Sequence, residues 1–263
     1  MDLNNLIQKY NDEGFISKIP IISNQEALLH RKSLEKAEKE IGDLHYKTKV
    51  HTILKSPWKL ATNNKVLDIV EKIIGPNILL HNVTYIIKEP KSLSHVTWHQ
   101  DLTYWGFSSD EQVSVWIALS PATKKSGCMQ MIPKSHTWGK LEHIKTYDKN
   151  NVLSSGQTVN NIDESRSVYC ELDAGQASFH NGWILHKSNP NNSDDRRIGV
   201  NIQYLATNVK QLKHNKDSAI CVRGIDKFNH FFKDVPASTD LEEKAIKKFN
   251  EVTKLYKKTQ RMN

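Results

Sequence analysis

The sequence predicts an α+β fold with a mainly β core, in which helices near the N-terminus pack on a barrel of two sheets. The first observation is a run of short segments after residue 77, rich in β-branched and aromatic residues and separated by turn residues. The second is the pattern of the first 77 residues, where apolar residues recur at helical spacing. The chain of 263 residues is also long enough to bury one sizeable core. We therefore expect a single domain.

Three helices are expected in the N-terminal part. Each has apolar positions three or four residues apart and stops at a glycine, which commonly takes the left-handed conformation at the end of a helix. Between the first two helices, residues 15–23 are expected to form a strand, and Pro20 limits it to a sheet edge or a strand end. The helices are expected at residues 1–14, 24–42 and 63–77.

Five strands are expected to form the β core. Their segments are short and apolar, with turn residues between them. A polar stretch at about residues 137–167 interrupts the series and is typical of a lid, a binding loop or a disordered segment. Residues 242–262 have an amphipathic pattern and are expected to form a helix outside the barrel. The strands are expected at residues 78–90, 113–122, 127–135, 175–183 and 197–207.

Composition and charge favour a cytoplasmic globular protein. Hydrophobic residues make up 38% of the chain and charged residues 25%, and the apolar runs are too short to cross a bilayer. The N-terminus lacks the basic and apolar regions of a signal peptide, and three cysteines without a C-x-x-C pair suit a reducing compartment.

The net charge of +8 is spread along the chain without a nucleic-acid-binding motif. This pattern favours a solubilising surface over nucleic-acid binding. We therefore expect a small-molecule substrate and neither a nucleic-acid nor a membrane partner, while a monomer and a homodimer both stay open.

The segment TWHQDLTYWG, residues 97–106, places two ligand-type side chains close together. His99 and Asp101 would point to the same side of an extended segment, so they could share a metal ion or form an ordinary polar pair. Non-haem iron(II) enzymes that activate oxygen use two histidines and one carboxylate, which leaves positions open for a cosubstrate and oxygen. The third ligand would have to come from residues 175–204, which contain His180 and His186.

His186 is the better candidate because of the residues that follow it. Ser188 comes two positions later, and Arg197 begins a predicted strand. The planar guanidinium of arginine binds a carboxylate through two hydrogen bonds, as recognition of a dicarboxylate cosubstrate requires. His180 is interpreted instead as a core histidine.

These segments resemble the phytanoyl-CoA dioxygenase family of iron(II)- and 2-oxoglutarate-dependent oxygenases. WHQD is similar to the family's first ligand motif. GCMQMIPKSH resembles its characteristic strand and turn, with Lys134 where glycine is usual. HKSNPNNSDDRRIGVNIQY resembles its second ligand segment, with Lys187 in place of glycine. The likeness runs from about Gly14 to Phe231.

The resemblance implies a fold and a domain arrangement. The family fold is a double-stranded β-helix, a cupin-like jelly roll, which agrees with the strand pattern. Residues 1–263 would form a single oxygenase domain, with a helical N-terminal support at 1–80 and a C-terminal extension and helix at 211–263. Residues 81–210 would form the jelly-roll core, with the polar insertion at about 137–167.

Carried over by position, the resemblance assigns the site residues. His99, Asp101 and His186 become the catalytic iron ligands, and Arg197 and Ser188 hold the far carboxylate of 2-oxoglutarate. The other assignments each have an alternative, because the same residue types also occur at strand ends, in cores and on solvated strands. They are Asn82 and Trp116 beside the cosubstrate, Lys88 near the mouth of the site, and Trp98, Tyr104 and Trp105 along the substrate pocket.

The implied reaction is hydroxylation of a small organic metabolite, with iron(II) as the metal and with 2-oxoglutarate and O2 as cosubstrates. Relatives that halogenate carry a small residue at the position of Asp101, so the carboxylate here favours hydroxylation. The aromatic residues and Lys88 predict a small polar or zwitterionic substrate, such as an amino acid, a betaine or an aminoalkylphosphonate. The alternatives are an acyl-CoA hydroxylase of the same mechanism, a zinc hydrolase with the same ligands and a non-catalytic jelly roll.

Overall fold

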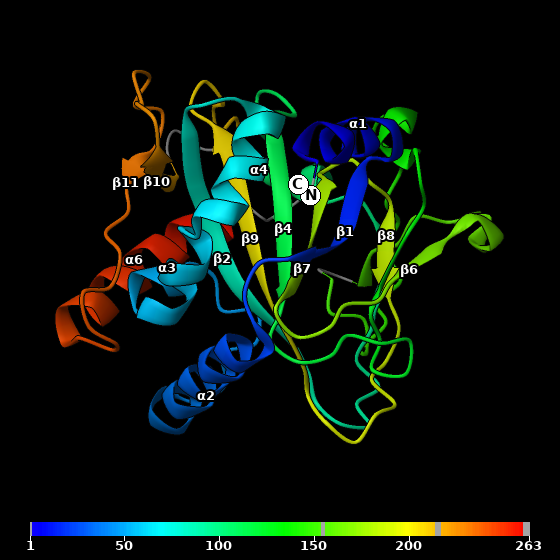
Figure 1. Cartoon of the computed structure of the whole chain (residues 1–263), viewed down its shortest axis with the longest axis horizontal. Helices are drawn as coiled ribbons and strands as arrows, with labels where there is room; N and C mark the ends of the chain where they lie inside the picture. The colour runs from blue at the N-terminus through cyan, green and yellow to red at the C-terminus, as the bar shows by residue number, and fades with distance from the viewer. Residues whose placement is uncertain (1, 154–155, 214–216, 260–263) are drawn as a thin grey trace. The chain divides into compact units, whose positions relative to one another are not determined.

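The computed structural model describes residues 2–153, 156–213 and 217–259, and many of its helices and strands are labelled in Figure 1. Residues 1, 154–155, 214–216 and 260–263 of the predicted segments therefore lie outside the described residues. The chain divides into two compact units. The first comprises Met1–Ala27, Ile87–Thr103 and Ile117–Gly199, and the second comprises Leu28–Ile86, Tyr104–Trp116 and Val200–Asn263.

The three helices predicted for the N-terminal part are present. Asp2 caps the first by accepting a hydrogen bond from the backbone N–H of Asn4 at 3.0 Å, and Gly14 ends it with a φ of 83°. Two short helices between residues 50 and 61 are additional to the prediction. The helices of this part are α1 (Leu3–Glu13), α2 (Asn24–Ile41), η1 (Val50–Thr52), α3 (Lys55–Ala61) and α4 (Asn64–Ile74).

Every predicted strand is present, and five short strands are additional. The additional strands have two to six residues, so pairing with a neighbour decides them more than their own sequence. The strands are β1 (Phe15–Pro20), β2 (Ile78–Lys88), β3 (Val96–His99), β4 (Gln112–Ala118), β5 (Met129–Met131), β6 (Val168–Cys170), β7 (Gln176–Asn181), β8 (His186–Ser188), β9 (Arg197–Ala206), β10 (Ser218–Arg223) and β11 (Phe232–Lys233). The later helices are α5 (Leu102–Trp105), η2 (Ser135–Trp138), η4 (Glu164–Arg166) and α6 (Glu243–Thr259).

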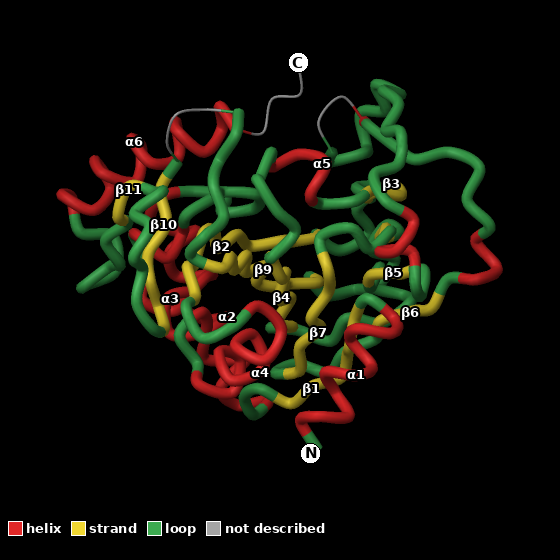
Figure 2. The backbone as a smooth tube through the Cα atoms, turned by 90° about the horizontal axis from the view of Figure 1, so that it is seen from above, coloured by secondary structure: helices red, strands yellow, loops and turns green. Residues whose placement is uncertain are grey.

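The first unit contains two groups of strands. One is the antiparallel pair of β1 and β7, in which Pro20 is the last residue of its strand, as predicted. The other is a four-stranded sheet with the order β3-β8-β5-β6, of which Figure 2 labels β3, β5 and β6. Its pairs are antiparallel, and the register places His99 opposite His186 and Met129 opposite Ser188. This register brings the ligand segments of the sequence together.

The second unit is built on strands in the order β4-β9-β2-β10-β11. β2 and β9 are buried along nearly their whole length, as expected of strands covered on both faces. Leu79, Leu205 and Phe231 belong to one hydrophobic cluster of this unit. The chain is thus a mixed α/β structure with large β-sheets, and the predicted barrel is not closed among the described residues.

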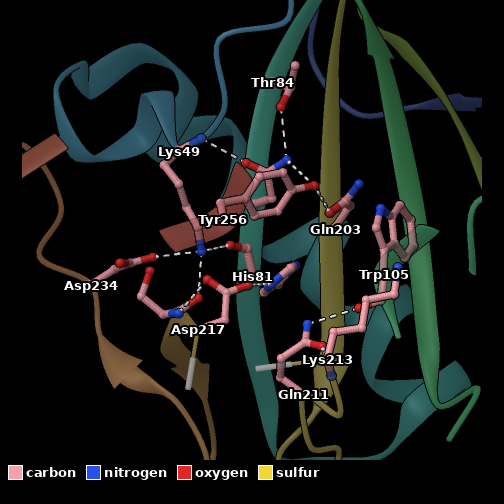
Figure 3. Close-up of polar contacts among 12 residues, drawn as sticks. Lys49, His81, Thr84, Trp105, Gln203, Gln211, Lys213, Asp217, Asp234 and Tyr256 are labelled. Carbon is pink, nitrogen blue, oxygen red and sulfur yellow. Dashed lines mark hydrogen bonds and ion pairs between the residues drawn. The ribbon is translucent and has the colours of Figure 1, made fainter. Parts of the chain in front are cut away.

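A buried ionic cluster ties the C-terminal extension to this unit (Figure 3). Lys49 Nζ lies 3.2 Å from Asp234 Oδ2 and donates to the carbonyl oxygens of His81 and Ser218. His81 Nε2 lies 2.7 Å from Asp217 Oδ2. The side chains of Lys49, His81, Asp217 and Asp234 have no solvent exposure, and buried His51 places its Nε2 3.5 Å from Asp234 Oδ2, so the charges of this cluster are compensated inside the protein.

Helix α6 packs beside β10 in both views (Figures 1 and 2). Val252, Thr253 and Tyr256 of this helix are buried, and the Tyr256 hydroxyl lies 3.2 Å from Asn82 Nδ2 and 3.3 Å from Gln203 Oε1. Most lysines of the helix are exposed, in agreement with the amphipathic pattern. Among all helices that the structure describes, none has the length and hydropathy to span a membrane.

Candidate metal centre

Two neighbouring strands place the histidines of the site side by side. His99 is the last residue of β3 and His186 the first of β8, and the two are paired across the antiparallel ladder. Their ring centroids are 4.0 Å apart. Asp101 follows in a turn instead of on the extended segment that the sequence suggested. The backbone N–H of Leu102 donates to Gly182 O at 3.0 Å in this turn.

The three side chains form the metal-ligand set that the sequence predicted. One donor atom from each of His99, Asp101 and His186 lies within 4.8 Å of the others. Asp101 Oδ1 lies 3.5 Å from His99 Nε2 and 3.9 Å from His186 Nε2. Each histidine has its Nδ1 against a backbone carbonyl, Thr97 O at 2.9 Å and Ile184 O at 3.0 Å. These contacts fix the Nδ1–H tautomer, so both Nε2 lone pairs point to one place.

The protonation states also suit metal binding. Burial and the neighbouring His99 hold the pKa of His186 well below its usual value, so this imidazole is neutral. Burial works to raise the pKa of Asp101, but contacts with His180 and His99 outweigh it and hold that pKa well below its usual value. Two imidazoles and one carboxylate are a donor set that fits iron(II) and leaves coordination positions open.

His180 adds a contact that sequence reasoning did not assign. It lies on β7, is 2% exposed, and places its Nε2 3.6 Å from Asp101 Oδ2. Its ring centroid is 5.0 Å from that of His186. Asp101 therefore meets the two ligand histidines through Oδ1 and His180 through Oδ2, which orients the carboxylate. Only its position six residues before His186 could have signalled this role.

Ser188, Lys88 and Arg197 form a buried polar group in the same unit. Lys88 Nζ donates to Ser188 Oγ at 2.8 Å, to Ser188 O at 3.1 Å and to Asn189 O. Arg197 is 1% exposed at the start of β9. Burial and the positive charge of Arg197 lower the pKa of Lys88 to about 6. Lys88, expected near the mouth of the site, is 2% exposed.

Trp98 lies on the face of the sheet opposite the ligands, because adjacent residues of a strand point to opposite sides. It packs with Ile132, Val159 and Leu185, and its Nε1 donates to Glu164 Oε1 at 2.9 Å. A pocket of about 450 Å³ lies on this face. Its lining includes Thr97, Trp98, Asn161, Glu164, Lys187 and Pro190.

The remaining predicted site residues belong to the second unit. Asn82 accepts a hydrogen bond from the backbone N–H of Lys49 at 2.7 Å, and its Nδ2 donates to Thr84 Oγ1 at 2.9 Å. Trp116, Tyr104 and Trp105 are all at most 7% exposed. The roles of these four residues toward cosubstrate and substrate stay predictions.

The chain is similar in sequence to known dioxygenases. A family model described as phytanoyl-CoA dioxygenase (PhyH) matches residues 23–199. A probable alpha-ketoglutarate-dependent hypophosphite dioxygenase from Stutzerimonas stutzeri is 28% identical over 149 residues, which are 56% of this chain and 52% of that protein. The peroxisomal phytanoyl-CoA dioxygenase of Homo sapiens is 25% identical over 155 residues, which are 57% of this chain and 46% of that protein.

Similarity to a solved structure extends over nearly the whole chain. The non-heme monooxygenase ThoJ in its apo form matches with a TM-score of 0.86 and 26% identity, covering 97% of this chain and 96% of that chain. By contrast, the chain spans about half the length of the curated relatives that it matches.

Proposed function

The chain belongs to the phytanoyl-CoA dioxygenase family, whose model matches residues 23–199, and on this premise we propose that it is an iron(II)- and 2-oxoglutarate-dependent dioxygenase. Its reaction is hydroxylation of a small organic metabolite, coupled to decarboxylation of 2-oxoglutarate to succinate and CO2. The observation that carries the proposal is the buried set of His99, Asp101 and His186, with its two Nε2 atoms aimed at one carboxylate oxygen.

Five polar residues of the first unit have roles in the proposed reaction. His99 Nε2, Asp101 Oδ1 and His186 Nε2 hold the metal. Arg197 binds the far carboxylate of 2-oxoglutarate with its planar guanidinium, and the Ser188 hydroxyl supports that carboxylate. When bound, iron(II) supplies the activation of oxygen that couples loss of CO2 to hydroxylation of a substrate C–H bond. The buried setting excludes water and strengthens these polar contacts.

The finer fold and domain assignments are part of the same proposal. We assign the sheets to a double-stranded β-helix in a single oxygenase domain, with residues 81–210 as its core. The similarity to ThoJ along 97% of the chain supports this assignment. Asn82 and Trp116 are proposed to contact the cosubstrate, and Tyr104 and Trp105 to shape the substrate pocket. Trp98 packs on the opposite face of the sheet, and Lys88 is buried against Ser188, so neither is assigned to that pocket.

For the substrate we propose a small polar or zwitterionic compound. The relative from Stutzerimonas stutzeri, named for hypophosphite, supports a small substrate because it matches over a similar length and at higher identity than the human protein named for phytanoyl-CoA. The aromatic face of Tyr104 or Trp105 would hold the ammonium group of such a compound by cation–π attraction. An acyl-CoA substrate remains the second candidate, because the human relative carries that name.

A screen for succinate release tests the proposal. The protein is incubated with iron(II), ascorbate and 2-oxoglutarate, and small amino acids, betaines, aminoalkylphosphonates and acyl-CoA thioesters are added one at a time. We expect stimulation by a small zwitterion and loss of turnover in His99→Ala, Asp101→Ala and His186→Ala, each with an unchanged circular dichroism spectrum. Stimulation by thioesters alone would reject the substrate class. Hydrolysis without succinate would point to a zinc hydrolase, and failure to bind iron(II) or 2-oxoglutarate to a non-catalytic protein.

A further inference from the structure

The polar insertion is defined as residues 137–167, and its described residues, 137–153 and 156–167, cover the back of the sheet that carries the metal ligands. Its Leu141, Val159 and Ile162 belong to the hydrophobic cluster around Trp98, together with Ile132 and Leu185. Trp98 and Leu185 each directly precede a ligand histidine, so their side chains lie on the opposite face of the sheet. The insertion therefore packs behind the ligands, where a lid over the metal would not lie.

The same segment is hydrogen-bonded along the free edge of β3. The backbone N–H of Val159 donates to Trp98 O at 2.8 Å, and the Thr97 hydroxyl donates to Gln157 O at 2.5 Å. Asn151 Nδ2 donates to Thr97 Oγ1 at 2.8 Å. These bonds hold the strand that ends at His99 from its outer side, while β8 pairs with its inner side.

Gln100 stands between two ligands and joins three segments. Its Nε2 donates to Gly139 O at 2.8 Å and to Trp183 O at 2.9 Å, and its Oε1 accepts from the backbone N–H of Leu141 at 2.8 Å. The first and third partners belong to the insertion, and Trp183 belongs to the turn that leads to His186. Because the partners are two acceptors and one donor, only this orientation of the carboxamide satisfies them all.

A fourth bond completes the connection. The backbone N–H of Gln100 donates to His143 Nε2 at 3.0 Å, and His143 Nδ1 lies 3.0 Å from Leu141 O. The Gln100 side chain has no exposed surface. A buried amide whose hydrogen bonds all go to other segments fixes the relative positions of those segments, since each lost bond would leave a buried polar group unpaired.

We propose that the insertion supports the metal centre from behind the sheet and that Gln100 is the positioning residue that joins the insertion to both ligand strands. The proposal rests on the proposed function, because it assigns the support of that same site. Coupling between two sites is reciprocal. A metal that draws His99, Asp101 and His186 together therefore orders the insertion, and release of the insertion weakens metal binding.

Gln100→Met tests the coupling, because methionine has similar length and makes none of these bonds. Gln112→Met is the matched control: Gln112 is 1% exposed, and its Nε2 donates to the neighbouring Ser114 Oγ. The probe is Co(II) with 2-oxoglutarate, whose visible absorption reports the coordination of the metal. Amide hydrogen exchange is followed at residues 141–153 and 156–159 with and without the probe.

In the wild type and the control, we expect the probe to slow this exchange on the order of tenfold. In Gln100→Met the slowing falls below about twofold, the Co(II) spectrum changes, and Co(II) affinity falls roughly 10- to 100-fold, as for other residues that orient metal ligands. If Gln100→Met showed the same slowing as the wild type and an unchanged Co(II) spectrum, the inference about the insertion would be overturned, and the proposed function would stand. Failure of the wild type to bind Co(II) would overturn the proposed function, and the inference with it.

A second variant covers the case in which Gln100→Met does not fold. His143→Leu removes one of the four bonds and leaves the Gln100 carboxamide in place. We expect a partial effect, with Co(II) affinity lowered on the order of threefold and an intermediate change in exchange. If His143→Leu behaved like the wild type in both measurements, the result would contradict the proposed support of the metal centre by the insertion.

Discussion

At the scale of single residues, the site depends on side chains whose orientation is fixed by neighbours. The two ligand histidines present Nε2 because their Nδ1 atoms face the carbonyls of Thr97 and Ile184. Asp101 presents Oδ1 because its Oδ2 lies against His180. Such contacts set the tautomer and the ring plane before a metal binds, which lowers the cost of assembling the centre.

Arg197→Lys is predicted to weaken 2-oxoglutarate binding by roughly 1.5–3 kcal/mol, the range for hydrogen bonds to charged groups. Lysine keeps the charge but loses the planar pair of donors. Calorimetry on the Co(II)-loaded protein measures the change. Arg196→Lys is the matched control, because Arg196 instead pairs with Glu89, with Nη2 2.8 Å from Oε1. Similar losses in both variants would show that the wrong arginine has been assigned.

Lys88 is predicted to make stability rise with pH. Its pKa is about 6 in the folded protein, lowered by burial and by Arg197, whereas an unfolded lysine titrates near 10.4. Between these values the unfolded state binds one more proton, so the free energy of unfolding increases with pH by up to about 1.4 kcal/mol per unit. Below pH 6 both states are protonated and the dependence disappears.

Urea unfolding at pH 7.5 and pH 9 measures this slope, in a range above the titration of histidine. We expect the slope to be flatter in Lys88→Met. Lys91→Met is the control, because Lys91 pairs with Asp194 at an exposed position and should keep the wild-type slope. Parallel slopes in Lys88→Met and the wild type would mean that Lys88 stays charged when folded.

At the scale of elements, short segments are held by pairing partners more than by their own sequence. β3 and β8 have four and three residues, yet their pairing sets the distance between the ligand rings. In the second unit, η1, β10, β11 and α6 meet around the buried Lys49 and Tyr256 (Figure 3). The C-terminal extension is thus joined to β2 by polar contacts, while Phe231 and Ala219 contribute apolar ones.

Lys49→Met is predicted to destabilise the protein by roughly 3–5 kcal/mol, because it leaves the buried Asp234 carboxylate without its partner. Burial acts to raise the pKa of Asp234, but the charge of Lys49 outweighs it and holds that pKa far below the usual value. Adding Asp234→Leu should recover part of the loss, since the double variant no longer buries the Asp234 carboxylate. Urea unfolding of the four proteins of this cycle measures the coupling.

Lys247→Met provides the comparison at the surface. Lys247 pairs with Glu243 at 2.9 Å, but both side chains are more than 70% exposed. We expect a change within about 0.5 kcal/mol, the usual worth of such a helical pair. If Lys49→Met also changed the free energy of unfolding by only about 0.5 kcal/mol, the buried ionic cluster would contribute no more to stability than this exposed pair.

At the scale of the whole molecule, helices α1, α2 and α4, the long strands and the ligand residues were predictable from the sequence, because each has a local signal. The glycines end the helices, β2 and β9 are long apolar runs, and His99, Asp101 and His186 stand in recognisable segments. Lys134 occupies a position where the similar family motif has glycine. Its φ of 67° lies in the left-handed region, which glycine adopts without steric cost, and this explains why glycine is usual there.

The rest could not be predicted, because it depends on contacts between distant segments. Gln100 and His143 are 43 positions apart, and no pattern in the sequence links them. The face of β3 on which Trp98 lies follows from the register with β8. The ionic cluster joins Lys49 to Asp234 across 185 positions. The sequence of the polar insertion therefore predicts only a loop, although its few apolar residues pack on the sheet.

Metal and cosubstrate are each predicted to raise the melting temperature, and the cosubstrate is predicted to do so only after the metal has bound. A ligand present at 100 times its Kd stabilises the folded state by about 2.7 kcal/mol, which corresponds to roughly 5–10 °C for a chain of this size. Co(II) should give such a shift alone. 2-Oxoglutarate should add a second one only when Co(II) is present, because the metal completes its site. Arg197→Lys should lose most of the second shift and keep the first, whereas Asp101→Ala should lose both. Thermal unfolding followed by circular dichroism measures each shift, and an equal response to 2-oxoglutarate without metal would contradict a cosubstrate site built on the three ligands.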